Sequence, residues 1–174
     1  MMKIQCLLLD VDGVLTDGKL IYTSSGEEMK AFNAQDGLGL ALARRSGLRL
    51  GIITGRTSPM VERRAGELKF DFLRMGSSNK SEAIRELMKE TSIDASAIAY
   101  MGDDLNDLGA FAMVGLAIAP ANAVTDVKNR ADYITQASGG CGAVREAVEY
   151  ILKREGVWNR LVEDYEREIY AHGQ

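Results

Sequence analysis

Short segments rich in leucine, isoleucine and valine alternate along this chain with longer segments whose apolar residues recur at helical spacing. Strands buried on both faces of a parallel sheet read as continuous apolar runs, and helices that cover the two faces connect them. The pattern therefore predicts an α/β fold in which a Rossmann-like parallel sheet is flanked by helices. The segments expected to form strands are 5–10, 49–54, 70–75, 97–102, 115–119 and 133–135.

Three of the intervening segments carry the signals of helices. Residues 37–46 stop at Gly47, and glycine commonly terminates helices. Ser58 is expected to cap the next helix, because serine is a favoured capping residue and Pro59 suits the first helical position. Residues 81–91 predict a third helix. Its apolar stripe consists of Ala83, Ile84, Leu87 and Met88.

Two segments depart from this alternation. Residues 18–34 contain two strand-like runs joined by Ser-Ser-Gly-Glu, which predicts a β-hairpin after the first strand. The hairpin is either a decoration or, because exposed strand edges pair with other chains, a contact with a partner. Residues 143–172 predict one or two amphipathic helices, broken at Gly156, that pack on the body or across a subunit interface. Their common apolar face is expected to contain Trp158, Leu161, Val162, Tyr165 and Ile169.

Composition narrows the classes of protein that fit this pattern. A chain of 174 residues with 46% hydrophobic residues suits one domain, residues 1–174, with a substantial core. The formal net charge of -4 disfavours nucleic acid as a partner, since phosphate backbones are bound by basic surfaces. The first residues match neither a signal peptide nor a membrane span. The two cysteines, Cys6 and Cys141, make no disulfide framework, which favours a cytoplasmic location.

Carboxylates are the side chains expected to carry chemistry, because the chain has a single histidine, His172. Asp10 and Asp12 end the first apolar run, and residues i and i+2 of a strand point to the same side. Two carboxylates this close repel each other unless a cation binds or one of them holds a proton, and both situations are typical of reactive sites. The alternative is an ordinary strand that ends in an Asp-Gly turn.

Two further clusters follow predicted strands, and open α/β sheets bind their ligands at the carboxyl ends of strands. Thr54, Gly55 and Arg56 offer a hydroxyl, an accommodating backbone and a guanidinium, which suit a phosphate. Lys80 stands at the start of a predicted helix, where its ammonium group and the helix N-terminus both favour an anion.

A last cluster, MGDDLND, is acidic. Asp103 and Asp104 end a predicted strand, and Asp107 follows one helical turn later. With Asp10 and Asp12, Asp103 supplies the oxygen ligands typical of magnesium, which also keeps waters or a substrate phosphate oxygen. Asp107 is alternatively a carboxylate on a helix surface.

In this order the clusters resemble the motifs of the haloacid dehalogenase superfamily of phosphotransferases. The matching segments are DVDGVLTDG, Thr54, Lys80 and GDDLND, which together span essentially the whole domain. The resemblance implies that Asp10 is a nucleophile that forms an aspartyl-phosphate, and that Asp12 acts first as an acid and then as a base. It implies further that Thr54 and Lys80 hold phosphoryl oxygens, that magnesium is bound by the Asp10 carboxylate, the Asp12 carbonyl and Asp103, and that Asp104 and Asp107 orient metal waters and Lys80.

The resemblance also favours simple phosphate hydrolysis. Dehalogenases of the superfamily lack the second aspartate, and a phosphomutase normally needs a cap domain that retains its intermediate. The intervals between the motifs hold only the hairpin, helices and a strand, so no cap fits. An open site implies a macromolecular substrate or a wall supplied by a neighbouring subunit, and the hairpin is well placed for the second.

Within the superfamily the chain is similar to the 3-deoxy-D-manno-octulosonate 8-phosphate phosphatases of lipopolysaccharide precursor synthesis. The segments that carry this similarity are DVDGVLTDG with its hairpin, KAFNAQDGLGL, GIITGRTSPMVERRA, MGDDLND and GGCGAVREAVEYIL. The similarity implies this sugar acid phosphate as substrate and a homotetramer built around the hairpin. Arg56, Arg64 and Arg145 become candidates for the substrate carboxylate, although Arg64 and Arg145 equally suit surface ion pairs. Cys141 replaces an arginine common in the family, so a substrate or subunit contact differs there.

Three alternatives remain open. The first is a capless phosphatase for a sialic-type nonulosonate 9-phosphate, although such relatives tend to carry Glu at the position of Arg56. The second is a phospho-accepting receiver domain, in which the acidic pair precedes the acceptor aspartate instead of containing it. The third is a non-catalytic oligomerisation module with this fold. The residues that argue against the third are Asp10, Asp12, Thr54, Lys80 and Asp103.

Overall fold

Six parallel strands form the central sheet, in the order β5-β4-β1-β6-β7-β8. Their bounds in the computed structural model, which describes residues 3–172, are Cys6–Leu9 (β1), Arg49–Ile53 (β4), Phe72–Arg74 (β5), Ile98–Met101 (β6), Leu116–Ala119 (β7) and Tyr133–Ile134 (β8). Each strand lies inside a segment predicted as a strand, so the α/β prediction is confirmed. The side chain of His172 lies outside the described part.

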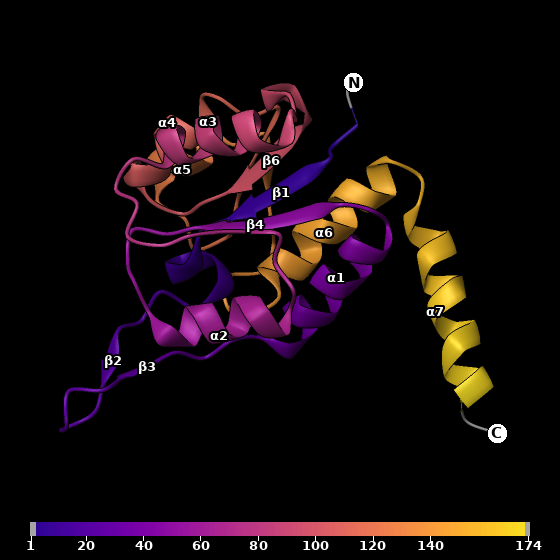
Figure 1. Cartoon of the computed structure of the whole chain (residues 1–174), viewed down its shortest axis with the longest axis horizontal. Helices are drawn as coiled ribbons and strands as arrows, with labels where there is room; N and C mark the ends of the chain where they lie inside the picture. Colours follow the sequence, from indigo (N-terminus) through magenta and orange to yellow (C-terminus); the bar gives the residue numbers. More distant parts are fainter. Residues whose placement is uncertain (1–2, 173–174) are drawn as a thin grey trace.

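Helices cover both faces of the sheet (Figure 1). One face carries α1 (Ala34–Arg45), α2 (Pro59–Glu67) and α6 (Ala143–Arg154), and the other carries α3 (Lys80–Thr91), α4 (Leu108–Phe111) and α5 (Thr125–Lys128). Successive strand residues point to opposite faces, so Leu7 and Leu9 join the first core whereas Cys6 and Leu8 join the second. Burial on both faces explains why the strands read as unbroken apolar runs.

The helix starts differ from the predictions in detail. Helix α1 begins three residues early because the Asn33 side chain caps it, accepting hydrogen bonds from the backbone N–H groups of Gln35 and Asp36. Helix α3 begins at Lys80, with Asn79 as the capping residue. Ser58 occupies the capping position of α2, as predicted, but its side chain makes no capping hydrogen bond, so the expected contribution of the serine side chain is absent. Proline at the first position pre-sets the helical φ angle of α2.

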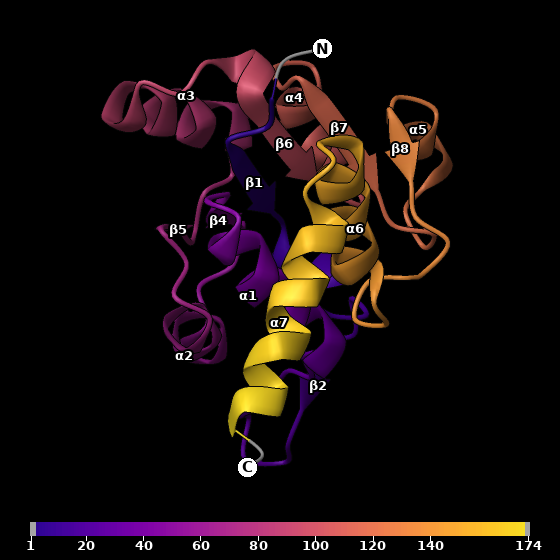
Figure 2. The ribbon, with the colours of Figure 1, turned by 90° about the vertical axis from the view of Figure 1, so that its right-hand side faces the viewer.

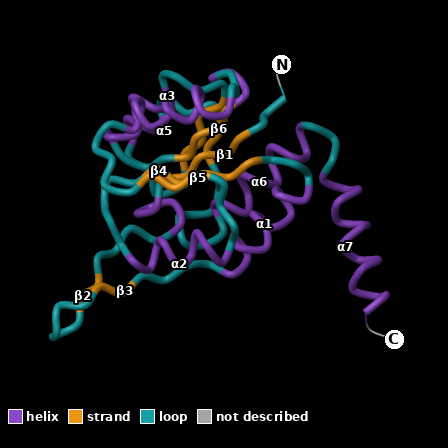
Figure 3. The backbone as a smooth tube through the Cα atoms, viewed as in Figure 1, coloured by secondary structure: helices purple, strands orange, loops and turns teal. Residues whose placement is uncertain are grey.

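The predicted hairpin is present as β2 (Ile21–Tyr22) and β3 (Glu28–Met29), which pair antiparallel. It projects from the body of the molecule (Figures 1 and 3). Gly26 has φ +82° at its turn, a conformation that L side chains rarely adopt. The exposed apolar side chains of the hairpin segment are Leu20, Ile21, Tyr22 and Met29.

The C-terminal segment forms two helices, as predicted. Gly156 has φ +72° and separates α6 from α7 (Trp158–His172). Trp158 is buried and Tyr165 is half-buried against the core on the α1 and α6 side, whereas Ile169 is exposed, so the predicted apolar face is only partly covered. In Figure 1, α7 lies at the end of the molecule remote from the hairpin, and Figure 2 looks at it from that end. Within residues 3–172, no helix combines the length and hydropathy that crossing a membrane requires.

The order of the strands locates the place where a ligand is expected. From β1 the chain moves to β4 and β5 on one side, and it then crosses back to β6, β7 and β8 on the other side. The direction of winding therefore reverses next to β1. Open α/β sheets bind ligands at the carboxyl ends of the strands at such a reversal.

Candidate active site

A cleft of about 290 Å³ opens at the carboxyl ends of β1, β4 and β6. Most of the residues predicted to carry chemistry meet here. The residues that line the cleft are Asp10, Asp12, Gly18, Leu20, Thr54, Gly55, Arg56, Asp103, Asp104 and Asn106. The cleft is polar and open, as expected for a site without a cap domain.

The two aspartates of the first motif reach the cleft by a route that differs from the prediction. Strand β1 ends at Leu9, and Asp10 N–H still donates to the carbonyl of Met101 on β6 at 3.0 Å. The chain then makes a wide turn over Val11–Leu15, in which Asp12 and Gly13 have non-helical backbone angles, so a continuous strand does not carry both carboxylates. Asp10 Oδ1 accepts from the backbone N–H of Val11 at 2.6 Å, which fixes its orientation. The turn brings Asp12 back to the same cleft.

Gly13 permits a close approach between the first motif and Asp103. It has φ +84°, and a Cβ atom built there would lie 2.0 Å from Asp103 Oδ2. Any side chain at this position would displace the Asp103 carboxylate. The Asn122 side chain holds the same turn, since its amide N–H₂ donates to the Gly13 carbonyl at 3.0 Å and its oxygen accepts from Gly139 N–H at 2.6 Å.

We expect Gly13→Ala to lower the free energy of unfolding by about 1–3 kcal/mol and the affinity for magnesium at least about 10-fold. The added methyl group would push Asp103 aside in addition to straining φ. Gly26→Ala is a matched control, because Gly26 has φ +82° and nothing lies within 4 Å of a Cβ built there. Urea unfolding and a magnesium titration measure both effects. Equal magnesium affinities in the two variants would contradict the role assigned to Gly13.

Lys80 joins two of the acidic motifs. Its side chain is 1% exposed, and its Nζ donates to Asp10 Oδ2 and to Asp107 Oδ1, the latter at 2.5 Å. Burial alone would lower the pKa of Lys80, but Asp10 and Asp107 outweigh it and raise that pKa. The ammonium group therefore stays charged between Asp10, which lines the cleft, and Asp107, although Lys80 itself is not among the lining residues.

Asp107 is fully buried, so the alternative of a carboxylate on a helix surface is wrong. Its Oδ1 accepts from Lys80 and from the Tyr100 hydroxyl at 2.7 Å. Its Oδ2 accepts from the backbone N–H groups of Asp103 at 2.8 Å and Asp104 at 3.1 Å. Gly102 makes room for it, since a Cβ there would lie 2.3 Å from the carboxyl carbon. Asp107 thus links Lys80 to the loop that carries Asp103.

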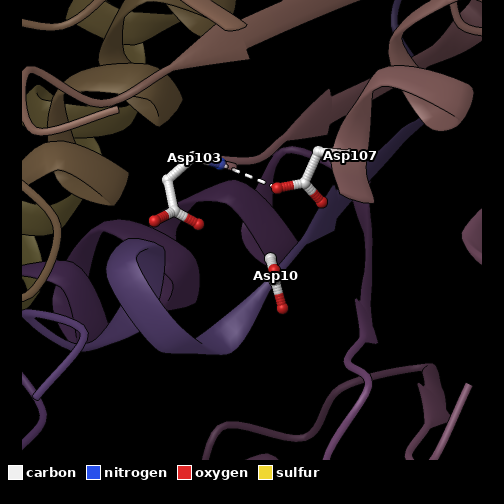
Figure 4. Close-up of side chains that lie close together, drawn as sticks. All are labelled: Asp10, Asp103 and Asp107. Atoms are coloured by element: carbon white, nitrogen blue, oxygen red, sulfur yellow. Dashed lines mark hydrogen bonds between the residues drawn. The ribbon is translucent and has the colours of Figure 1, made fainter. Parts of the chain in front are cut away.

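Asp10, Asp103 and Asp107 each place a carboxylate oxygen within 4.8 Å of the others. Figure 4 shows how the three side chains lie. Each oxygen of Asp107 already accepts two hydrogen bonds, so Asp10 and Asp103 are the groups that remain to bind a cation. Burial, followed by the charges of Asp10 and Asp107, raises the pKa of Asp103 to about 7. Burial also raises the pKa of Asp10, although Lys80 opposes it. This crowding of oxygen ligands fits magnesium.

We expect magnesium to raise the melting temperature more at about pH 8 than at about pH 5.5, with a shift of about 5 °C at the higher pH. The pKa of Asp103 is about 7 in the folded protein and 3.8 ordinarily, so the metal-free folded state binds an extra proton between these values. Its stability therefore falls as pH rises through that window, and a cation that competes with the proton restores it. Thermal melting with and without magnesium at both pH values measures this, and equal shifts would contradict it.

The predicted cluster of Thr54, Gly55 and Arg56 also lies in the cleft. Thr54 and Gly55 follow β4 and line the cleft together with Asp10. The Arg56 guanidinium donates to Glu28 Oε1 at 2.8 Å and to the Tyr22 hydroxyl at 3.1 Å, so the hairpin reaches this side of the site.

The other two predicted arginines do not line the cleft. Arg64 lines a neighbouring cavity of about 370 Å³, where its guanidinium lies 5.8 Å from the centre of the Phe32 ring. Arg145 pairs with Glu149 at 2.8 Å and lies over the Trp158 ring. Their roles in substrate binding stay predictions. Cys141 is exposed.

The sequence reasoning missed Lys30 and Tyr100. Lys30 Nζ donates to Asp12 Oδ1 at 2.5 Å, although the two residues are 18 positions apart. Alternation along the second strand of the hairpin was an available signal, since it places Glu28 and Lys30 on one side and Met29 on the other. Tyr100 is fully buried in an apolar strand, and only its hydroxyl marked it as different from the rest of the core.

Comparisons with known proteins agree with this geometry. A family model described as haloacid dehalogenase-like hydrolase matches residues 74–147. The phosphatase KdsC of Escherichia coli K12, which acts on 3-deoxy-D-manno-octulosonate 8-phosphate, is 44% identical over 88% of this chain and 82% of its own length. A crystal structure of this phosphatase from Moraxella catarrhalis, in complex with magnesium, phosphate and KDO, has a TM-score of 0.91 and 44% identity over 93% of both chains. The cobalt-bound phosphatase of Haemophilus influenzae has a TM-score of 0.85 and 40% identity over 88% of this chain and 90% of its own.

The parallel sheet with its acidic cleft and these relatives define the class of the protein, which is the haloacid dehalogenase-like hydrolases. Within that class, the identity over most of both chains shows that this chain belongs to the family of 3-deoxy-D-manno-octulosonate 8-phosphate phosphatases.

Proposed function

We propose that this protein is a magnesium-dependent phosphatase that hydrolyses 3-deoxy-D-manno-octulosonate 8-phosphate to the free sugar acid and phosphate. The observation that carries the proposal is the convergence of Asp10 and Asp103 at the end of β1, in a cleft also lined by Asp12 and Thr54. Lys80 contacts Asp10 from behind this lining. The chemistry rests on this geometry. The substrate rests on the 44% identity to phosphatases of this sugar acid.

Two displacements at phosphorus complete the reaction. A carboxylate oxygen of Asp10 attacks the phosphoryl group, and the bond from phosphorus to the sugar oxygen breaks with its electron pair on that oxygen. Asp12 gives a proton to the departing oxygen. Asp12 then takes a proton from a water whose oxygen attacks the aspartyl-phosphate, which frees phosphate and restores Asp10.

The remaining residues in or near the cleft are proposed to bind and orient the substrate and the metal. Thr54, Gly55 and Lys80 are proposed to hold phosphoryl oxygens, where N–H and O–H donors stabilise the charge that develops. Asp10, the carbonyl of Asp12 and Asp103 are proposed to hold magnesium, with Asp104 and Asp107 orienting its waters and Lys80. When bound, magnesium neutralises charge that would otherwise repel the anionic nucleophile. Arg56 is proposed to bind the substrate carboxylate, with Arg64 and Arg145 as further candidates.

Phosphate release with and without magnesium tests the proposal. The panel contains 3-deoxy-D-manno-octulosonate 8-phosphate, a sialic-type nonulosonate 9-phosphate and several sugar phosphates. A magnesium-dependent preference for the octulosonate is expected. Comparable slow release from every ester would keep the mechanism but discard the substrate, a preference for the nonulosonate would favour the first alternative, and no release would favour a non-catalytic module.

We also propose a cytoplasmic, single-domain subunit that assembles as a homotetramer through the hairpin. Support for this assembly comes from the four apolar side chains that the hairpin exposes, because an exposed hairpin edge is suited to pairing with another chain. A neighbouring subunit would also supply the wall that an open cleft lacks. The α7 face around Ile169 is a second candidate for such a contact.

We expect replacement of the hairpin tip, residues 24–27, by a shorter turn to lower the mass in solution, because shortening the arm removes contact with the neighbouring subunit. Ser24→Ala, which keeps the full hairpin, serves as the control. Sedimentation at several protein concentrations measures the mass. An unchanged mass would exclude the hairpin tip from the assembly.

A further inference from the structure

The hairpin places two charged side chains, Glu28 and Lys30, beside residues of the cleft, and no step of the proposed reaction uses either of them. Lys30 Nζ lies 2.5 Å from Asp12 Oδ1 and 3.4 Å from Glu28 Oε1. The Arg56 guanidinium pairs with the same two carboxylates: Nη2 lies 2.8 Å from Glu28 Oε1 and Nε lies 3.8 Å from Asp12 Oδ2. Charges of opposite sign thus alternate around a closed ring of four side chains, which we call the charged ring: Asp12, Lys30, Glu28 and Arg56.

Burial separates Lys30 from an ordinary surface lysine. Its side chain is 2% exposed, whereas the side chain of Lys19, on the same hairpin and paired with Asp17, is 75% exposed. A lysine ammonium group withdrawn this far from water is rarely found without a partner. Asp12 and Glu28 supply that pairing, so the position of the ammonium group and the position of the Asp12 carboxylate determine each other.

The charged ring also holds the hairpin against the body of the molecule. Strands β2 and β3 have two residues each, and a hairpin of this size is marginal without contacts to the body. The hydrogen bond from Arg56 to the Tyr22 hydroxyl at 3.1 Å adds to the contacts of Glu28 and Lys30. Leu20 of the hairpin segment lines the cleft, so the hairpin is part of the wall of its own site as well as a candidate contact in an assembly.

We propose that Lys30 is a positioning residue for Asp12, an inference that rests on the acid and base roles proposed for Asp12 above. An N–H of the ammonium group holds Oδ1, whereas Oδ2 lies 3.8 Å from Arg56 Nε, too far for a hydrogen bond, and is left to exchange the proton with substrate or water. The contact serves both steps. Oδ1 accepts as the carbonyl oxygen while Oδ2–H protonates the departing sugar oxygen, and as a carboxylate oxygen while Oδ2 takes the proton of the attacking water.

The effect of replacing Lys30 should therefore depend on the leaving group of the ester. The alkoxide of a sugar phosphate needs a proton as it departs, whereas the nitrophenolate of p-nitrophenyl phosphate departs without one. In Lys30→Met, single-turnover release of the sugar acid is expected to fall about 10- to 100-fold. Release of nitrophenolate in the same single turnover, which precedes hydrolysis of the aspartyl-phosphate, is expected to stay within about 3-fold of the unaltered protein, and KM for the sugar phosphate within about 2-fold.

Controls separate this role from folding and from substrate binding. Lys19→Met makes the same change on the exposed side of the hairpin and is expected to alter neither rate. If Lys30→Met does not fold, Lys30→Gln is the second variant and is expected to show the same selective loss, because its amide is uncharged and its side chain is shorter than that of lysine. Thermal melting of each variant reports whether the hairpin contact affects stability.

Other outcomes would overturn the inference. An equal loss with both esters would assign Lys30 a structural role, and no loss would assign it none. A raised KM with kcat retained would make Lys30 a substrate-binding residue, a role open to it because it also lines the cavity that contains Arg63 and Arg64. If the unaltered protein released neither alcohol with magnesium, the proposed function itself would fail, and the inference with it.

Discussion

Replacement of Asp10 by Asn is expected to reduce turnover by roughly 10⁵-fold or more, because an amide does not supply the anionic oxygen that attacks phosphorus. The change leaves the shape of the side chain almost unaltered. Phosphate release on the best substrate measures the loss. Acid quenching followed by mass spectrometry detects the aspartyl-phosphate, which is expected in the unaltered protein and absent from Asp10→Asn.

A surface substitution of the same kind controls for the chemistry of the exchange. Asp126 lies on α5, is exposed and pairs with Arg130 at 3.4 Å, so Asp126→Asn is expected to keep full activity. The opposite result would be an Asp10→Asn variant that turns over within about 10-fold of the unaltered protein and still becomes phosphorylated. That result would show that another residue is the nucleophile.

The fold could be predicted from the sequence because its strands are buried on both faces. Leu7 and Leu9 pack on one side of β1 and Leu8 on the other, so the run carries no polar residue that would obscure it. Helix ends were less predictable. Asn33 and Asn79 begin α1 and α3 through side-chain hydrogen bonds, whereas Ser58 has the residue type of a cap and makes no such bond. Capping depends on side-chain orientation, which residue type alone does not specify.

The acidic part of the site was predictable for a geometric reason. Asp10 and Asp103 each follow a strand, and neighbouring parallel strands bring their carboxyl ends to one edge, so the two carboxylates had to meet. Asp12 was placed correctly by an incorrect argument, since the wide turn after Asp10 replaces the assumed strand. The contact of Lys30 with Asp12 was not predicted, because it depends on how the hairpin folds back onto the body, and tertiary contacts determine that.

A network of buried charges is the feature that unites the site. Lys80 contacts both Asp10 and Asp107, and Asp107 holds the amides of the loop that carries Asp103. One ammonium group therefore stabilises the proposed nucleophile and, through Asp107, the position of a proposed metal ligand. Removal of that group should affect folding as well as catalysis.

Lys80→Met is expected to lower the free energy of unfolding by about 3–5 kcal/mol near neutral pH, because it leaves buried carboxylates without their cation. It is also expected to lower kcat by about 10²- to 10³-fold through loss of a donor to the phosphoryl group. Urea unfolding and phosphate release measure the two effects. Lys89→Met, at an exposed position of the same helix, is the control and is expected to change neither.

The pH dependence of the loss distinguishes this cause from poorer packing. Burial already raises the pKa of Asp10 above its ordinary 3.8, and removal of Lys80 takes away the largest interaction that lowers it. The folded variant therefore takes up a proton as pH falls, whereas the unfolded chain does so only near the ordinary value. Stability is regained as pH falls through that window, so the destabilisation should be smaller at about pH 5.5 than at about pH 7.5. A loss that is equal at both values would mean that the methionine side chain fits badly, and that the charge of Lys80 contributes little to the fold.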